Sequence, residues 1–477
     1  MQPAKKRSSG VTPVPGEDDR ARLRAAIDGG NNILLLATEL LTLCRDQLEA
    51  LITADDDVRT WRRRDALRRE AEALFELVDD EEIDADERAT LHDLAADYDD
   101  LPAVAVARTI AEALDAALGH RFLAMFLGRA VALREGDPIP TPHPDWRTLT
   151  PQPNSDPWAL DGRLDALPHL RLASDWARQV RVTIDGDWRT WHAVPQLGPG
   201  DRVACALPNA SFDELEFRRK TVEGRAMFYD LHPRLGDDEQ AARCIALLER
   251  AAEQGCRLVV FPELSVPRGV VDELARWLDR QQTVELVVAG SHHHKAKNGR
   301  WHNESQILFR GWRRRRRHRK FRPFSFIDTE GQTRVTRTED LAQTSPRMHV
   351  YLSTSWTLAL LICKDAVVEP VPRALVDLRA NLVLVPALSF KLDAFRAAVS
   401  DVATWSQGIA LVANAGFGAS PRAARPGVVV GLPSQSSSVH RESPPPLSLL
   451  VVTIGNQSKM PSLRTVLAGP PEGASIS

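Results

Sequence analysis

The stretch Trp356-Thr-Leu-Ala-Leu-Leu-Ile-Cys-Lys-Asp365 is almost wholly apolar until it reaches Cys363. A second stretch, Arg257-Leu-Val-Val-Phe-Pro-Glu263, is also apolar until Pro262 interrupts it and Glu263 follows. Short apolar runs separated by helical segments are typical of strands that a layered α/β fold covers on both faces. Because such folds bind ligands at the carboxyl ends of their strands, Glu263 and Cys363 are candidate functional residues.

Further apolar runs extend this pattern over residues 201–463, which we expect to form a single α/β domain. The runs occupy residues 203–207, 284–289, 306–309, 381–385, 409–413 and 447–454. We expect the last of them to be an edge strand. Residues 464–477 are rich in Gly, Pro and Ser, which predicts a flexible C-terminal tail.

The N-terminal part of the chain has a different pattern. Between residues 21 and 135 apolar residues recur at helical spacing, as at Ile33, Leu36, Leu40 and Leu43. This spacing predicts an all-α helical domain, whose role it leaves open. The composition of residues 1–20 predicts a disordered tail. The composition of residues 136–200 predicts a proline-rich linker followed by a short mixed segment of unassigned role.

The composition is that of an ordinary globular chain of 477 residues, of which 43% are hydrophobic and 26% charged. Because 61 basic and 64 acidic side chains leave a formal net charge of -3, no overall field favours nucleic acid or an anionic membrane. The five cysteines are too few and too scattered for a disulfide framework, which predicts reduced thiols and a cytoplasmic protein. We expect no signal peptide and no membrane anchor, since no apolar stretch reaches the roughly twenty residues that a spanning helix needs.

One segment, Trp312-Arg-Arg-Arg-Arg-Arg-His-Arg-Lys-Phe-Arg322, concentrates positive charge. It is compatible with a solvated hairpin, with a polyanion or nucleic-acid site, or with one catalytic cation among bystanders. A protein that binds single-stranded nucleic acid needs aromatic residues on which bases stack, and here these are limited to Trp312 and Phe321. We therefore expect no nucleic-acid partner; binding with a steep dependence on salt concentration would contradict this expectation.

A carboxylate, a lysine and a thiol together can carry out nucleophilic catalysis by cysteine. A cysteine nucleophile needs a base, and a carboxylate can serve if a desolvated site raises its pKa toward the working pH. The reaction also needs a cation or oriented backbone N–H groups where negative charge develops on the attacked substrate. Glu263, Lys320 and Cys363 can supply these groups.

With these residues the sequence resembles the nitrilase or carbon–nitrogen hydrolase superfamily, whose members carry a Glu-Lys-Cys triad in that chain order. The resemblance covers about residues 201–418, in five ordered blocks. The blocks are Cys256-Arg-Leu-Val-Val-Phe-Pro-Glu-Leu264; Val287-Val-Ala-Gly-Ser291 with Asn303 and Arg319-Lys-Phe-Arg-Pro323; Leu361-Ile-Cys-Lys-Asp365 with Glu369 and Arg373; Ala380-Asn-Leu-Val-Leu-Val-Pro-Ala387; and Leu411-Val-Ala-Asn-Ala-Gly416.

The resemblance implies a four-layer α-β-β-α sandwich for the C-terminal domain and a hydrolase that acts on non-peptide carbon–nitrogen bonds. Glu263, Lys320 and Cys363 would be catalytic, and the backbone N–H of Lys364 would help to stabilise the oxyanion. The expected substrate is a small amide or nitrile, with amide favoured, and the expected intermediate is a covalent thioester. No cofactor is required, and the family implies a homodimer or a larger homo-oligomer.

Two features depart from the family pattern. Arg322 and Pro323 follow the Arg-Lys pair, where the family usually has His and Leu. Many members also carry a second Glu about eight residues after the lysine, to position substrate and water. That offset falls on Asp328, with Glu330 close behind, so both are candidates for this role.

Two further interpretations remain open. The run His292-His-His294 suggests metal binding, but neighbouring residues on an extended segment point to opposite sides, so we expect no metal site. The alternative to an enzyme is a non-catalytic or regulatory nitrilase-like module, with a helical N-terminal domain that binds a protein partner.

Overall fold

The computed structural model describes residues 17–55, 58–142, 167–209, 214–330, 333–342, 345–417, 425–432, 438–442, 447–455 and 462–467. The chain divides into two compact units. The N-terminal unit comprises Met1–Met125, Gly136–Pro140 and Pro153–Leu172, and the C-terminal unit comprises the rest of the chain. Residues 1–16 of the predicted tail at 1–20 lie outside the described residues, whereas residues 17–20 begin a helix, Glu17–Gly29. Much of the predicted linker, residues 143–166, also lies outside the described residues.

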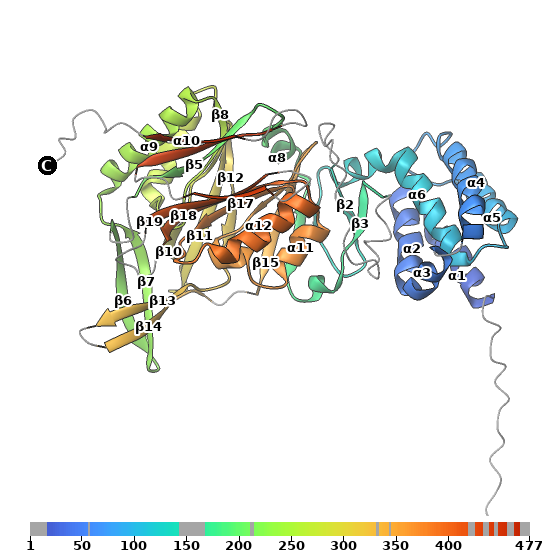
Figure 1. Ribbon diagram of the computed structural model, residues 1–477, viewed down its shortest axis with the longest axis horizontal. Helices are drawn as coiled ribbons and strands as arrows, with labels where there is room; N and C mark the ends of the chain where they lie inside the picture. The colour runs from blue at the N-terminus through green and yellow to red at the C-terminus, as the bar shows by residue number, and fades with distance from the viewer. Residues whose placement is uncertain are drawn as a thin grey trace, which may run out of the picture. The chain divides into compact units, whose positions relative to one another are not determined.

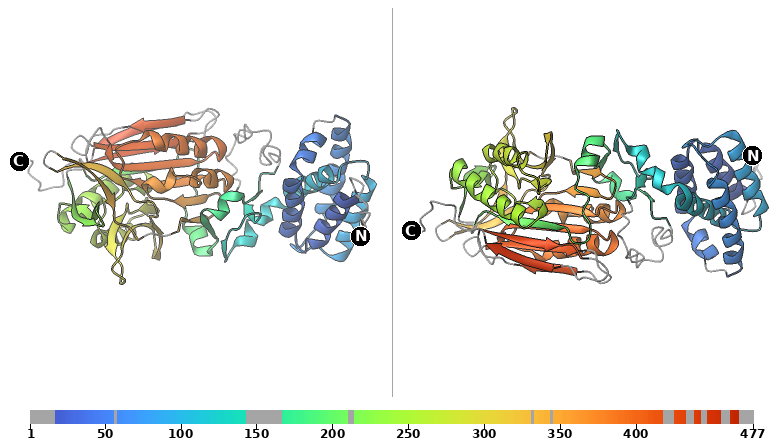
Figure 2. Two further views of the ribbon diagram at one scale, coloured as in Figure 1. Left: turned by 90° about the horizontal axis from the view of Figure 1, so that it is seen from below. Right: turned by 90° about the horizontal axis from the view of Figure 1, so that it is seen from above.

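Helices make up most of the described N-terminal unit (Figure 2). They are α1 (Glu17–Gly29), α2 (Ile33–Asp46), α3 (Leu48–Asp55), α4 (Val58–Phe75), α5 (Ala85–Asp97) and α6 (Ala103–Phe122). Helix α6 contacts α1, α2, α3 and α4, and its buried residues, from Ala103 to Phe122, include both Glu112 and Asp115. A two-stranded sheet of β2 (Pro138–Pro140) and β3 (Leu170–Leu172) completes the unit, and the 3-10 helix η1 (Ala124–Phe126) comes at its boundary in sequence.

Two large sheets form the centre of the C-terminal unit (Figure 1). The first sheet has the order β1 (Ala130–Ala132), β4 (Arg181–Asp185), β15 (Arg347–Leu352), β16 (Thr357–Leu360), β17 (Leu382–Ala387), β18 (Ile409–Phe417), β19 (Arg425–Leu432) and β20 (Ser438–Glu442). The second has the order β10 (His292–Lys295), β11 (Trp301–Phe309), β9 (Leu286–Val288), β8 (Cys256–Val260), β5 (Arg202–Leu207), β21 (Ser448–Thr453) and β22 (Ser462–Leu467), and β12 (Trp312–Arg319) also pairs with β11.

The two sheets pack face to face, and helices cover their outer faces. One apolar core joins residues such as Leu258 and Val288 of the second sheet to Leu358 and Leu384 of the first. Helices α9 (Asp237–Glu253) and α10 (Arg268–Leu278) share a separate core with the second sheet, whereas α12 (Asp393–Trp405) contacts β18, β19 and β20 of the first and also α11 (Val371–Asp377) (Figure 1). The mixed α/β character predicted for this half is confirmed.

Three segments behave differently from the sequence expectation. Strands β1 and β4, which precede residue 201, extend the first sheet, and η2 (Asp175–Arg178) and α8 (Trp188–Ala193) belong to the same unit. Strand β21 pairs with both β5 and β22, so the expectation of an edge strand at 447–454 is wrong. Residues 464–467 of the predicted flexible tail lie in β22, and residues 468–477 lie outside the described part.

A third, smaller sheet has the order β13 (Ser325–Glu330), β14 (Thr333–Glu339), β7 (Arg225–Pro233) and β6 (Leu215–Val222). It carries an apolar cluster rich in phenylalanine, which includes Phe228, Phe326 and the adjacent Phe324. The same cluster contains Leu264 and Leu388, which follow strands of the two large sheets. The small sheet therefore packs over the strand ends where the candidate residues lie.

Within the described residues, none of the helices combines the length with the apolar character that crossing a bilayer requires.

Candidate active site

Cys363 lies at the turn that follows strand β16. The residue begins the 3-10 helix η4 (Cys363–Ala366), and its backbone has φ +49°, in the left-handed region that L-residues seldom adopt. Such a conformation costs about 1 to 3 kcal/mol and persists only where the surrounding structure enforces it. The side chain is 2% exposed, and its Sγ lies 3.5 Å from the carbonyl oxygen of Leu388, which follows β17.

Glu263 lies at the corresponding end of β8 in the second sheet. Its backbone N–H donates to the carbonyl of Ala387 in the first sheet, at 3.3 Å, which ties the two sheets together at this edge. The next residue, Leu264, also has a positive φ, +59°, and its N–H donates to Ser291 Oγ at 3.1 Å. Gly290 packs against this turn so closely that a Cβ there would lie 2.2 Å from the carbonyl oxygen of Pro262.

Lys320 connects the two carboxylates of the site. It directly follows β12, and its backbone N–H donates to the carbonyl of Asn303 on β11 at 2.9 Å. The Nζ donates to Glu263 Oε1 and to Glu339 Oε2, each at 2.6 Å, and all three side chains are fully buried. The structure thus brings Glu263 and Lys320, which follow strands of the second sheet, together with Cys363, which follows a strand of the first.

Glu339, at the end of β14, is held by four donors. Its Oε1 accepts from Asn303 Nδ2 at 2.9 Å and from His293 Nε2 at 2.8 Å. The His293 tautomer follows from its other nitrogen, because Nδ1 accepts from the backbone N–H of Leu231 and the proton must therefore be on Nε2. Oε2 accepts from Lys320 and from the backbone N–H of Phe324 at 2.9 Å. A carboxyl group with four donors around it must be ionised.

Burial and the neighbouring charges shift the pKa values of these groups in different directions. Burial raises the pKa of Glu263, and the negative charge of Glu339 raises it further, against the effect of Lys320. Burial also raises the pKa of the Cys363 thiol well above its ordinary value, and the carboxylate of Glu263 adds to this shift. Burial opposes the charge on Lys320, but the two carboxylates outweigh it and raise the lysine pKa. Burial likewise opposes the charge on Glu339, but Lys320 and His293 outweigh it and lower its pKa.

One carboxylate oxygen of Glu263 accepts no hydrogen bond from the described residues in this arrangement and can exchange a proton with the thiol. Glu263 Oε1 accepts from Lys320 and, at 2.8 Å, from Asn303, whereas Oε2 accepts no hydrogen bond from any residue the structure describes. A carboxylate with a raised pKa and an unused oxygen can take a proton from a nearby thiol. Lys364 is the second residue of η4, and the first N–H groups of a helix lack acceptors within it, so the Lys364 N–H is of the kind that stabilises an oxyanion.

Asp365 joins the turn that carries Cys363 to the segment that carries Lys320. Its buried carboxylate accepts from His318 Nε2 at 3.0 Å and from the backbone N–H groups of Arg322 at 2.8 Å and Phe321 at 3.2 Å. Burial raises the pKa of Asp365, and the contact with His318 opposes this shift. These bonds fix the chain on both sides of Lys320 relative to the thiol.

Several arginines of the basic run are paired with carboxylates. Arg316 pairs with Asp185 and Asp187, both at 3.4 Å, and Arg315 pairs with Asp272. Arg317 and Arg319, on the same face of β12 as Arg315, lie next to Glu304. Of the interpretations left open, one buried cation at the site, Lys320, matches this geometry best.

The residues expected from the family offset occupy other places. Asp328, on β13, accepts from Arg337 Nε at 2.7 Å and pairs with Arg219 at 3.4 Å. Glu330 ends β13, and its side chain lies outside the described residues. The second carboxylate on Lys320 is Glu339, which the sequence analysis did not single out. The β13–β14 hairpin separates it from Lys320, so only its position after a run of strand residues could have indicated it.

The residues described also contain a group that can hold a metal ion, formed by His292, His294 and Glu304. It lies on the opposite face of β10 from His293, which contacts Glu339. Burial lowers the pKa of His292 to about 4, so this imidazole is neutral at ordinary pH.

A family model for carbon–nitrogen hydrolases matches residues 231–414, within the C-terminal half of the chain. The predicted resemblance of this half to the nitrilase superfamily is thus confirmed, and the match of this segment to a family of hydrolases supports an enzyme. A search among curated proteins found no relative of the chain.

Solved structures similar to this chain include an amidase and two synthetases. An amidase from Nesterenkonia sp. is 16% identical over 55% of this chain and 93% of its own, with a TM-score of 0.36. The glutamine-dependent NAD+ synthetase from Acinetobacter baumannii is 15% identical over 57% of this chain and 48% of its own, with a TM-score of 0.37. A similar synthetase from Cytophaga hutchinsonii is 12% identical over 55% of this chain and 43% of its own, with a TM-score of 0.32.

Proposed function

We propose that the C-terminal unit is a cysteine-dependent hydrolase of non-peptide carbon–nitrogen bonds, an amidase, built on the four-layer sandwich of the nitrilase superfamily. The observation that carries the proposal is the position of Lys320. Its ammonium group bridges two buried carboxylates, Glu263 and Glu339, next to a cysteine in a left-handed turn. Such a cluster indicates a function, because burying charges costs more free energy than burying apolar side chains of equal size.

In the first step Glu263 removes the thiol proton through its open oxygen, and Cys363 Sγ attacks the carbonyl carbon of the amide. The C=O π electrons move to the oxygen, and Lys320 and the Lys364 N–H stabilise the resulting negative charge. A single donor in such a position typically contributes about 3 to 4 kcal/mol to transition-state stabilisation. Glu263 then gives the proton to the departing nitrogen, the C–N bond breaks, and an acyl thioester remains on Cys363.

In the second step water replaces the amine. Glu263 takes a proton from a water molecule, the hydroxide oxygen attacks the thioester carbon, and the C–S bond breaks. The thiolate recovers its proton from Glu263, and the carboxylic acid is released. Glu339 acts through Lys320, which it holds in place, and by keeping the pKa of Glu263 raised. No metal ion or organic cofactor enters either step.

The residues beside the thiol favour a substrate with an apolar acyl group. Phe324 and Leu388 belong to the phenylalanine-rich cluster, and each contacts the site through its backbone: the Phe324 N–H donates to Glu339, and the Leu388 carbonyl lies next to Sγ. Burial of an apolar group against such side chains contributes about 25 cal/mol per Å². The amine part of the substrate is expected to be small, as in a primary amide.

A panel of primary amides, nitriles, ureas and N-carbamoyl compounds, assayed for ammonia release by the full chain, tests the proposal. We expect turnover of at least one primary amide, and its loss in Cys363→Ala and Cys363→Ser. The control is Cys256→Ala, which removes a buried thiol of β8 outside the site and should retain turnover. Ammonia release that persists in Cys363→Ala would exclude the mechanism, and a chain that accepts no member of the panel would favour a non-catalytic module.

A further inference from the structure

The three adjacent histidines of β10 lie on two opposite faces of the strand. His293 points to Glu339, as described above, and is buried. Because side chains alternate along a strand, His292 and His294 lie together on the opposite face. From this alternation we expected no metal site on the strand. The alternation excludes only His293, and it brings the other two imidazoles to one side.

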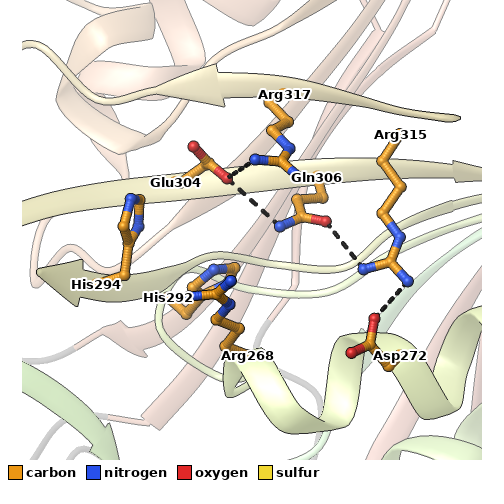
Figure 3. A pocket seen from close by; sticks show the side chains of 8 residues that line it. All are labelled: Arg268, Asp272, His292, His294, Glu304, Gln306, Arg315 and Arg317. Atoms are coloured by element: carbon orange, nitrogen blue, oxygen red, sulfur yellow. Dashed lines mark hydrogen bonds and ion pairs between the residues drawn. The ribbon is translucent and has the colours of Figure 1, made fainter. Parts of the chain in front are cut away.

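A carboxylate joins these imidazoles from the neighbouring strand. Glu304 on β11 is the direct cross-strand partner of His292, and it faces the same cavity (Figure 3). One ligand atom from each of His292, His294 and Glu304 lies within 4.8 Å of the other two. In a tetrahedral zinc site the ligand atoms are about 3.3 Å apart, since each bond is about 2.0 to 2.1 Å long. Modest side-chain rotations would therefore close the set around one ion.

The hydrogen bonds of these residues leave metal-binding atoms unused. His292 is 5% exposed, yet its Nδ1 has no hydrogen-bond partner among the described residues, and the same holds for His294 Nδ1. A buried nitrogen without a partner is costly, and most such atoms in folded proteins are paired. Both residues line the cavity, so an ion bound there can satisfy both nitrogens.

The carboxylate of Glu304 can also accept an ion. Its Oε1 has only long contacts, 3.4 Å to Gln306 and 3.5 Å to Arg317. Its Oε2 accepts from Arg319 Nε at 3.0 Å. The side chains of Arg317 and Arg319 are at least half exposed, so solvent screens their charges and Arg317 can turn away at little cost.

We propose that His292, His294 and Glu304 form a binding site for a divalent transition-metal ion of the Zn²⁺ type. Two imidazoles and one carboxylate make a donor set typical of zinc sites that keep a fourth position open. Here that position faces a cavity of about 280 Å³ whose wall includes Arg268. A water molecule or a small anion is the expected fourth ligand. The site is distinct from the triad, so the inference does not depend on the proposed hydrolase activity.

The test uses the untagged full chain, because an affinity tag of histidines would bind metal itself. The metal-free protein is titrated with Zn²⁺ in competition with a chromophoric chelator, and with Co²⁺ for its absorption spectrum. We expect one ion per chain and a Co²⁺ spectrum of the four-coordinate type. His294→Ala and Glu304→Gln should each weaken Zn²⁺ binding by about 100-fold or more.

Three controls keep the outcome clear. His192→Ala removes an exposed histidine of α8 and should leave binding unchanged. Cys363→Ala excludes binding of Zn²⁺ to the triad thiol, and it should also bind one ion. The melting temperatures of the metal-free variants show whether they fold. The proposal would be overturned if the wild-type chain did not bind Zn²⁺ one to one. It would also be overturned if folded His294→Ala and Glu304→Gln bound Zn²⁺ with wild-type affinity, or if the site bound an anion but no metal.

Discussion

Glu339→Gln is the substitution whose consequences follow most directly from the structure. The wild-type carboxylate accepts from four donors, two on each oxygen. Glutamine offers one acceptor oxygen and one NH2 group, so two of the four donors would face another donor. A buried donor without an acceptor costs about 1 to 3 kcal/mol, and the variant should therefore lose about 2 to 6 kcal/mol of stability in the C-terminal unit.

The same substitution should also change catalysis in a defined direction. Without the negative charge of Glu339, the pKa of Glu263 falls, because that charge contributes to raising it. Lys320 also loses one of its two carboxylate partners and is less firmly held. We expect kcat to fall by about 10²-fold, the effect typical of disturbing one oxyanion donor. KM should change little, because Glu339 acts through Lys320 and not on the substrate.

Calorimetry of the full chain and steady-state kinetics on the amide found in the screen would measure both effects. The matched control is Asp328→Asn, on the strand that precedes β14, because the family offset pointed to this residue and the structure pairs it with Arg337. We expect the control to keep the wild-type kcat. Wild-type stability and kcat in Glu339→Gln, or an equal loss of kcat in Asp328→Asn, would refute this account of the site.

Two further predictions concern the base and its backbone. Glu263 must be ionised to accept the thiol proton, and its pKa is raised, so kcat/KM should fall as the pH drops through a pKa above the usual range of a glutamate. In Glu339→Gln this fall in kcat/KM should occur at a lower pH. A fall at the same pH as in the wild type would show that Glu339 does not raise the pKa of Glu263. Gly290→Ala should abolish turnover and destabilise the C-terminal unit, because its Cβ would lie 2.2 Å from the Pro262 carbonyl oxygen at a backbone φ of +50°. Gly299→Ala is the control for a positive φ without a clash, because its Cβ would lie 3.9 Å from Lys295 Cε, and activity equal in both variants would show that the turn tolerates displacement.

The sequence predicted several buried strands of the two large sheets, such as β8, β16 and β17, because they are short apolar runs with a polar residue soon after. It did not predict β1, β4, β15 or β19. Glu263 and Cys363 could be found in this way, since each follows such a run directly. Lys320 required the family resemblance, because a run of basic residues contains no local signal that separates one buried cation from its neighbours.

The rest depended on pairings between distant parts of the chain. Glu339 is 19 residues from Lys320, and only the return of the β13–β14 hairpin brings the two together. Similarly, β4 enters the first sheet beside β15, far along the chain, so its short sequence gave no indication of a partner. Spacing alone also could not place the carboxylate of Glu304 on β11, which lies opposite His292 of β10.

The proposed mechanism requires Glu263 and Lys320 to activate the thiol of Cys363. All five cysteines are buried, and burial raises the pKa of Cys205, Cys244 and Cys256 with no carboxylate contributing to the shift. Limited treatment of the full chain with iodoacetamide, followed by peptide mass spectrometry, measures the reaction rate of each thiol. We predict that Cys363 reacts much faster than the other four thiols and that Glu263→Gln removes this difference in rate. A Cys363 that reacts no faster than Cys205 or Cys244 in the folded wild-type chain would contradict it.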